Sequence, residues 1–148
     1  LSSLSGLPFR QGIAVTGAVN QYGEVLPVGG INEKIEGWFR VCEAAGLDGS
    51  QGVLIPARNR RHLMLEPRMV DAVSRGLFHV HAASHVSEGI ELLSGIPAGE
   101  LNVAEHYSHE SVLGHAQDRL QAFRRACSAV DNSSSRRPVR QAHLPPRR

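Results

Sequence analysis

Lys34 is the only lysine of the 148-residue chain, in which fifteen arginines supply all other fixed basic side chains. It stands within the segment PVGGINEKIEGWF, at residues 27–39. A guanidinium stays protonated in proteins, whereas an ammonium can lose its proton where its surroundings disfavour charge. A lone lysine in an arginine-rich chain is therefore a candidate general base. Codon bias offers the alternative, a single surface lysine without a chemical role.

The residues around Lys34 predict that it lies in the first turn of a helix. Asn32 is a favourable N-cap, and we expect an amphipathic helix over residues 33–45 that ends at Gly46. The apolar residues that recur at helical intervals are Ile35, Trp38, Phe39, Cys42 and Ala45. The positive end of a helix dipole disfavours a protonated ammonium, and the neutral amine is the form that can accept a proton.

Neighbouring residues leave two points open at this turn. Glu33 and Glu36 would favour the charged ammonium if they pointed at it, and their spacing does not decide this. Gly29 and Gly30 permit close approach of the backbone to a substrate or to another segment. The alternative is that the two glycines only form a turn.

The rest of the chain predicts alternating strands and helices, with a helix that ends at Gly6 and Pro8. Strands are expected at 12–20, 52–56 and 77–83, with a hairpin return after the turn NQYG, and helices at 67–75, 84–95 and 109–130. This order favours an α/β fold with some parallel pairing, in a mixed sheet with flanking helices.

Composition divides the chain into three parts. We expect residues 1–95 to form a folded portion, residues 96–130 to be a linker with a C-terminal helix, and residues 131–148 to be a disordered tail. The tail carries five arginines and one aspartate, whereas the remainder has a net charge of −2. Phosphate contacts of this basic tail with nucleic acid are a weaker alternative to a solvated terminus.

Other site classes have less support. Cys42 and Cys127 lie in apolar helical patterns, which predicts two buried thiols in a reducing compartment. No apolar run has the length of a membrane span. His79 and His81 share one face of a predicted strand, and EHYSHE at 105–110 adds two histidines, but the spacing matches no zinc signature. We therefore expect no metal site.

The segments IAVTG (13–17), NQYGEVLPVGGINEKIEGWF (20–39) and GVLIPARN (52–59) resemble the proteolytic domain of Lon proteases. The sequence of residues 20–39 is similar to that of the Lon-B-like branch, and the resemblance covers residues 1–95. It implies a C-terminal part of an ATP-dependent serine peptidase with a Ser–Lys dyad. In the family motif PVGGxxEK the lysine is the catalytic base, which implies that role for Lys34.

The same resemblance implies supporting residues around the base. Thr16 of the TG pair is expected to lie beside Lys34, with Gly17, Gly29 and Gly30 shaping the surrounding backbone. Ala18 stands where many relatives have a glutamate, so that acidic group is absent. The resemblance implies that the nucleophilic serine lies upstream of this chain, at the start of the helix that ends in LSSLSGLP. Ser2, Ser3 and Ser5 lie at the wrong end of that helix for the family geometry. Alone, the chain is expected to be inactive.

The resemblance also implies a larger assembly in the cytoplasm. A AAA+ ATPase module of the same protein would bind ATP and Mg²⁺, drive polypeptide substrates into a chamber and form a homohexamer. The phosphate-binding pattern GxxxxGKS or GxxxxGKT is absent from these residues, and we expect no cofactor in them. The alternative hypothesis is a catalytically inactive module that keeps the peptidase fold for binding or assembly.

Overall fold

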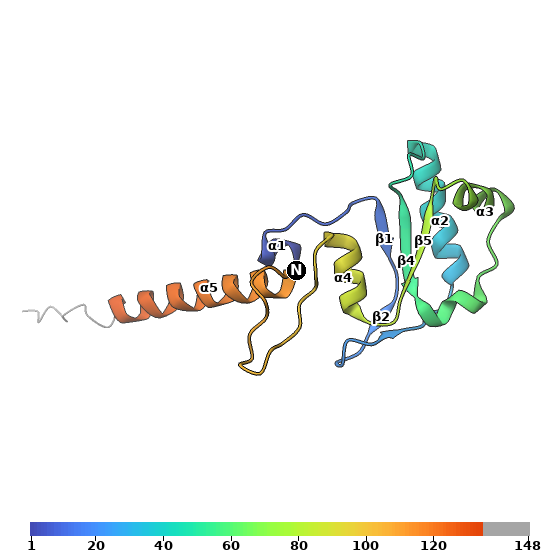
Figure 1. Cartoon of the computed structure of the whole chain (residues 1–148). Coiled ribbons are helices and arrows are strands. Elements are labelled where there is room, and N and C mark those ends of the chain that lie inside the picture. The colour runs from blue at the N-terminus through green and yellow to red at the C-terminus, as the bar shows by residue number, and fades with distance from the viewer. Residues whose placement is uncertain (135–148) are drawn as a thin grey trace, which may run out of the picture.

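A three-stranded parallel sheet lies at the centre of the protein (Figure 1). The computed structural model describes residues 1–134, with side chains up to residue 128. The strand order is β1 (Ile13–Val15), β4 (Gly52–Pro56), β5 (His79–Ala83). Every residue of β4 is buried, as expected of a central parallel strand covered on both faces. The α/β fold is confirmed, and β4 has the bounds that the sequence predicts.

The predicted continuous strand over residues 12–20 is wrong, because the chain leaves the central sheet after Val15. Residues of β2 (Ala18–Val19) and β3 (Val25–Leu26) pair antiparallel in a separate two-stranded sheet. Asn20 closes the predicted hairpin turn by accepting hydrogen bonds from two backbone N–H groups, those of Tyr22 and Glu24. Parallel and antiparallel pairs therefore occur in different sheets, not in one mixed sheet.

Two helices cover one face of the central sheet. They are α2 (Ile31–Ala45) and α3 (Pro67–Ser74), and α3 has proline at its first position as predicted. Phe39 of α2 meets Phe78 edge-to-face, with 5.2 Å between the ring centroids. The largest core cluster lies here and comprises Ile31, Ile35, Phe39, Cys42, Val53, Ile55, Met69, Ala72 and Phe78. The predicted amphipathic face of α2 is thus confirmed from Ile35 to Cys42, while Ala45 is exposed.

The start of α2 differs from the prediction, because Asn32 is not its N-cap. The N-cap is Gly30, and Asn32 is the second residue of the helix. The Asn32 side chain donates to the carbonyl of His62 at 3.2 Å and accepts from the amide of Met64 at 2.9 Å. These partners lie thirty residues further along the chain, so the local pattern gives no sign of them.

The opposite face of the sheet is covered by α4 (Val86–Ser94) (Figure 1). His85 is its N-cap and forms a capping box with Glu88, since each side chain bonds a backbone N–H of the other end of the turn. Gly89 has no side chain, and a Cβ there would lie only 3.0 Å from Leu54 of β4. The helix therefore packs closely on the central strand.

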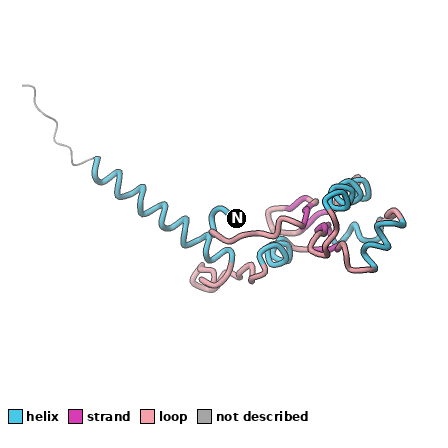
Figure 2. Tube along the Cα trace, turned by 90° about the horizontal axis from the view of Figure 1, so that it is seen from above, coloured by secondary structure: helices cyan, strands magenta, loops and turns pink. Residues whose placement is uncertain are grey.

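A long helix, α5 (Val112–Ser134), extends away from the sheet (Figures 1 and 2). Its first turns pack beside α1 (Ser2–Ser5), which ends at Gly6 as predicted, and bury Val112 and Ala116. The apolar side that the sequence predicts continues to Leu120, Phe123 and Cys127, but these side chains are exposed. The predicted disordered tail at 131–148 falls, from residue 135 onward, outside the described residues, and residues 131–134 are helical.

The two cysteines differ, so the prediction of two buried thiols is wrong for Cys127. Cys42 is buried in the main cluster, and burial, followed by the charge of Asp48, raises the pKa of its thiol. We expect Cys127 to react at once with Ellman's reagent and Cys42 at least ~100-fold more slowly, because thiolate and access are both required. Absorbance of the folded chain, compared with the chain in urea, measures this. Equal rates would show that helix α2 opens freely.

No helix of the part that the structure describes combines the length and the apolarity needed to cross a membrane.

Candidate active site

The candidate residues gather at the carboxyl edge of the parallel sheet. Thr16 directly follows β1, and its amide donates to the carbonyl of Leu54 at 3.0 Å, which extends the pairing of β1 with β4. The 3₁₀ helix η1 (Ala57–His62) directly follows β4. Because α2 connects the hairpin back to β4, its amino end lies at this same edge. Ligands of parallel α/β sheets bind in this position.

Lys34 is the fourth residue of α2 and is exposed. Its amide donates to the carbonyl of Gly30 at 3.2 Å, the first i to i−4 bond of the helix. Within the part of the chain whose side chains are described, no carboxylate forms a salt bridge with its amine. The amine therefore faces solvent near the positive end of the helix.

Two of the acidic residues of α2, Glu36 and Glu43, form salt bridges with arginines instead. Glu36 lies 3.9 Å from Arg40, whose guanidinium also bonds Glu66 at 2.7 Å. Hydrogen bonds from Arg40 and then Arg68 lower the pKa of Glu66. The question that the spacing of Glu33 and Glu36 leaves open is thus answered by geometry, because neither forms an ion pair with Lys34 in the described structure.

Asn59 holds the turn that leads into Lys34, and sequence analysis missed it. Its side chain is 4% exposed and forms two hydrogen bonds with Val28 across thirty-one residues. The carboxamide oxygen accepts from the Val28 amide, and the carboxamide nitrogen donates to the Val28 carbonyl, both at 3.0 Å. Both backbone groups of the residue before Gly29 are therefore fixed to η1. The only signal in the sequence is an asparagine shortly after a buried strand.

Gly30 must be glycine for a conformational reason, whereas Gly29 need not be. Gly30 has a φ of 64°, in the left-handed region, and Gly29 has no such backbone and open space around it. We expect Gly30→Ala to lower the free energy of unfolding by about 1–2 kcal/mol and Gly29→Ala to leave it nearly unchanged. Urea denaturation measures both. Equal losses would show that the turn, and not the φ of Gly30, sets the requirement.

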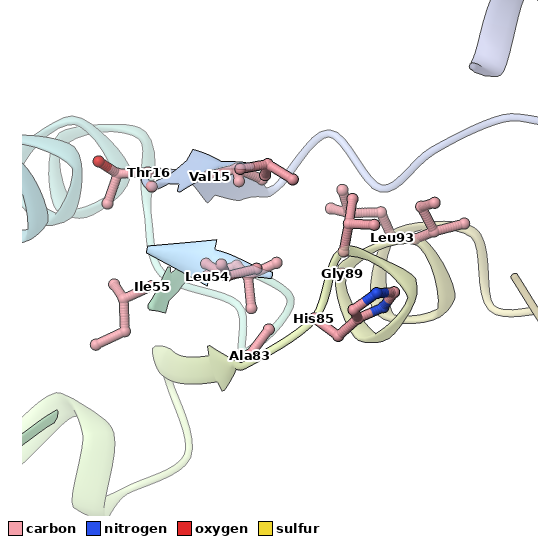
Figure 3. A pocket seen from close by; sticks show the side chains of 13 residues that line it. Val15, Thr16, Leu54, Ile55, Ala83, His85, Gly89 and Leu93 are labelled. Carbon is pink, nitrogen blue, oxygen red and sulfur yellow. The ribbon is translucent and has the colours of Figure 1, made fainter. Parts of the chain in front are cut away.

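A cavity of about 150 Å³ adjoins Thr16 on the α4 side of the sheet (Figure 3). Its walls are almost wholly apolar and include Val15, Leu54 and Ala83, with Thr16 and Gly17 at the carboxyl ends of the strands. A Cβ on Gly17 would lie 3.4 Å from both Pro56 and Val25, so the hairpin passes in contact with the end of β4. The structure thus brings Thr16 and Gly17 to this cavity, while Lys34, Gly29 and Gly30 are not among its lining residues.

His85 is a second residue that sequence analysis missed, and it borders the same cavity. Its Nε2 lies 3.1 Å from the carbonyl of Tyr22, so the residue that caps α4 also holds the turn of the hairpin. Gly23 accommodates the ring, because a Cβ there would come within van der Waals overlap of it. The pattern HVSE at 85–88 resembles a capping box and was the available signal.

The histidines singled out by the sequence do not form a metal centre in the residues that the structure describes, where no three His, Cys, Asp or Glu side chains could hold an ion together. The rings of His79 and His81 lie side by side, with 5.8 Å between centroids. His109 instead pairs with Asp118 of α5 at 2.7 Å.

Comparisons with known proteins show which family this chain resembles. Residues 1–94 match the profile of the Lon protease (S16) C-terminal proteolytic domain. The chain is 47% identical over 93 residues to a Lon protease homolog of Escherichia coli, covering 63% of this chain and 16% of that protein. It is 42% identical over 95 residues to a Lon protease homolog of Haemophilus influenzae, with coverages of 64% and 16%.

More distant similarity reaches archaea. The chain is 35% identical over 91 residues to an archaeal Lon protease of Archaeoglobus fulgidus, covering 62% of this chain and 13% of the relative. The chain thus spans about a sixth or less of the length of these relatives. The matched region contains α1 to α4, whereas the whole of α5 lies beyond it.

Proposed function

The chain belongs to the Lon proteolytic-domain family, and from this premise we propose that it supplies the general base of a serine endopeptidase, with Lys34 as that base. The proposed nucleophile is a serine that lies upstream of these 148 residues. Residues 1–95 would form the catalytic portion, and residues 96–130 the linker and C-terminal helix. Thr16, Gly17, Gly29 and Gly30 would support the site.

The proposed reaction is acyl transfer through a Ser–Lys dyad. The neutral amine of Lys34 accepts the serine proton while the serine oxygen attacks the carbonyl carbon of the peptide bond. The ammonium then returns this proton to the departing amine, which leaves an acyl-enzyme. Water, deprotonated by the same amine, cleaves the ester and restores the serine. An arginine could not carry either proton at neutral pH.

The observation that carries the proposal is the position of Lys34 within the structure. The only lysine of the chain lies at the start of α2, after a turn whose backbone is clamped by buried Asn59. Its amine forms no salt bridge with a carboxylate in the residues whose side chains are described. Thr16 lies at the same edge of the sheet, at the end of β1.

The wider assembly is proposed from the family alone. We propose that the complete protein is a cytoplasmic homohexamer with a AAA+ module, and that it degrades unfolded or regulatory polypeptides. ATP and Mg²⁺ would bind in that module; the pattern GxxxxGKS or GxxxxGKT is absent from these 148 residues. No step of the peptidase reaction above uses them.

An assay of the complete gene product tests the proposal. We expect it to hydrolyse casein in the presence of ATP and Mg²⁺ and to cleave short fluorogenic peptides, while the 148-residue chain alone cleaves neither. Comparing the two substrates distinguishes a loss of ATP-driven substrate unfolding, which affects casein alone, from a loss of peptide-bond cleavage, which affects both. A folded complete protein that cleaves neither substrate would instead be an inactive module with a peptidase fold.

A further inference from the structure

A polar cleft of about 500 Å³ lies at the amino edge of the central sheet, opposite the candidate active site. Its walls come from three segments that are distant in sequence: the approach to β1, the loop between α2 and β4, and β5 itself. The side chains that line it include Arg10, Gln11, Ser50, His79 and His81. Each of these carries a hydrogen-bond donor, and none carries a carboxylate.

The alternation of β5 explains why the two histidines point into this cleft. Val80 and Ala82 pack against the α2 side of the sheet, so His79, His81 and Ala83 point to the α4 side. Ala83 is covered by the residues of the second core cluster, whereas the two rings lie nearer the amino end of the strand. The backbone of Arg10 is held near this strand, because its amide donates to the carbonyl of Leu93 in the last turn of α4 at 2.8 Å.

His79 is held in a defined tautomer. Its Nε2 lies 2.9 Å from the carbonyl oxygen of Gly49, and a carbonyl can only accept, so the proton is on Nε2. Gly49 itself has a φ of 82°, and a Cβ there would lie 3.0 Å from the carbonyl of Gly76. Position 49, whose carbonyl orients the ring, therefore favours glycine. Protonation of Nδ1 would give the ring a second donor without disturbing this bond.

The acidic groups near the cleft are already occupied. Asp48 accepts from the amide of Ser50 at 2.8 Å and from its hydroxyl at 2.6 Å. On α4, Glu88 accepts from the amide of His85, and Glu91 from the amide of Ala98. Within the described part of the chain, Arg10, His79 and His81 form no salt bridge. Arg10 thus brings to the cleft a positive charge that has no counter-ion from these residues.

We propose that this cleft binds a phosphate group, with Arg10, His79 and His81 donating to its oxygens from two sides. A tetrahedral dianion suits donors that converge from a loop and a strand, and charge-assisted bonds to phosphate are among the stronger hydrogen bonds. A divalent cation suits the cleft less well, because only two imidazoles are present and the guanidinium of Arg10 repels it. The cleft has room for more than inorganic phosphate, so a phosphate carried on a larger molecule such as a nucleotide also fits.

Protonation and phosphate binding are coupled in this cleft. Burial, then the charges of His79 and Arg10, lower the pKa of His81. A bound dianion opposes those two charges and favours the imidazolium, so binding must raise that pKa. By reciprocity, the affinity of the cleft for a given phosphate species falls as the pH rises through the titration of His81, by about tenfold for each unit by which binding shifts the pKa.

Imidazole NMR signals of the histidine-labelled chain provide the test. We expect inorganic phosphate at 20 mM, against chloride of equal ionic strength, to shift the ring signals of His79 and His81 and to raise the titration midpoint of His81 by at least ~0.5 pH unit. Adenosine monophosphate should do so at lower concentration. Unchanged signals for both residues, or equal shifts for all histidines, would overturn the proposal.

Two variant pairs separate specific binding from general charge. Arg10→Gln should weaken phosphate binding at least ~5-fold, whereas Arg58→Gln, an exposed arginine at the opposite edge of the sheet, should leave it unchanged. His81→Gln should weaken it similarly, with His106→Gln as its control. Acetate that shifts the two rings as strongly as phosphate at equal concentration would overturn the assignment to phosphate. The experiments on the unsubstituted chain remain decisive if a variant does not fold.

Discussion

Replacement of Lys34 by arginine is expected to abolish peptide cleavage by the complete protein, lowering kcat/KM by at least ~1000-fold. Arginine keeps the positive charge, the length and the helix propensity of lysine, but its guanidinium does not give up a proton in proteins. The loss would therefore isolate the proton transfer from packing. Because Lys34 is exposed and has no ion-pair partner in the described residues, the exchange should leave the fold intact.

The matched control is Arg58→Lys, the reverse exchange at an exposed position of η1. Its cleavage rate should stay within twofold of the parent. Hydrolysis of a short fluorogenic peptide gives the rate, and circular dichroism shows whether both variants fold. If Lys34→Arg retains a tenth or more of the activity, Lys34 is an ordinary surface residue, and the general-base proposal fails even if the protein is a peptidase.

Elements built from short-range patterns were predictable from the sequence. The run GVLIP has the length and composition of a buried parallel strand, and Pro67 marks the start of α3 because its missing N–H costs nothing there. Gly6 and Gly95 terminate helices in the left-handed conformation, as their positions indicate. In each case the physical cause lies within a few residues of the observed feature.

Features that depend on distant partners were not predictable in this way. Asn32 is of a residue type that favours the N-cap, but it lies inside the helix, where its side chain bonds the backbone of His62 and Met64. The segment 12–20 is mostly apolar, yet it divides at Thr16 because Ala18 and Val19 pair with β3. Cys127 fits an apolar helical pattern, but α5 extends beyond the surface that could bury it.

The candidate site shows both kinds of information. Residue type made Lys34 a candidate, since a lysine, unlike the fifteen arginines of this chain, can lose its proton, and the motif PVGGxxEK indicated the same residue. Residue type could not identify Asn59, whose role depends on the approach of η1 to the turn before α2. The candidate base could thus be identified from a short segment of the sequence, whereas the residue that holds its turn could be identified only from the folded structure.

Asn59→Leu is therefore expected to have the largest effect on stability among residues that position the site, lowering the free energy of unfolding by about 2–4 kcal/mol. Leucine keeps the approximate size of the side chain but offers neither donor nor acceptor. The amide and carbonyl of Val28, half-buried, would each lose a partner, at about 1–3 kcal/mol where water cannot replace it. Urea denaturation of the chain measures the difference.

Asn20→Ala is the matched control, because Asn20 also forms two hydrogen bonds with backbone groups, in its case both as acceptor and at an exposed hairpin turn. Water can replace those bonds, so we expect a loss below ~1 kcal/mol. Because both residues form two hydrogen bonds with backbone groups, the comparison shows how much of the loss in unfolding free energy is due to burial of those bonds. A similar small loss in both variants would mean that water reaches Val28 and that the turn before Lys34 is held by Gly30 and the helix alone. A large loss only for Asn59→Leu, with lower peptidase activity in the complete protein, would identify Asn59 as a positioning residue for Lys34.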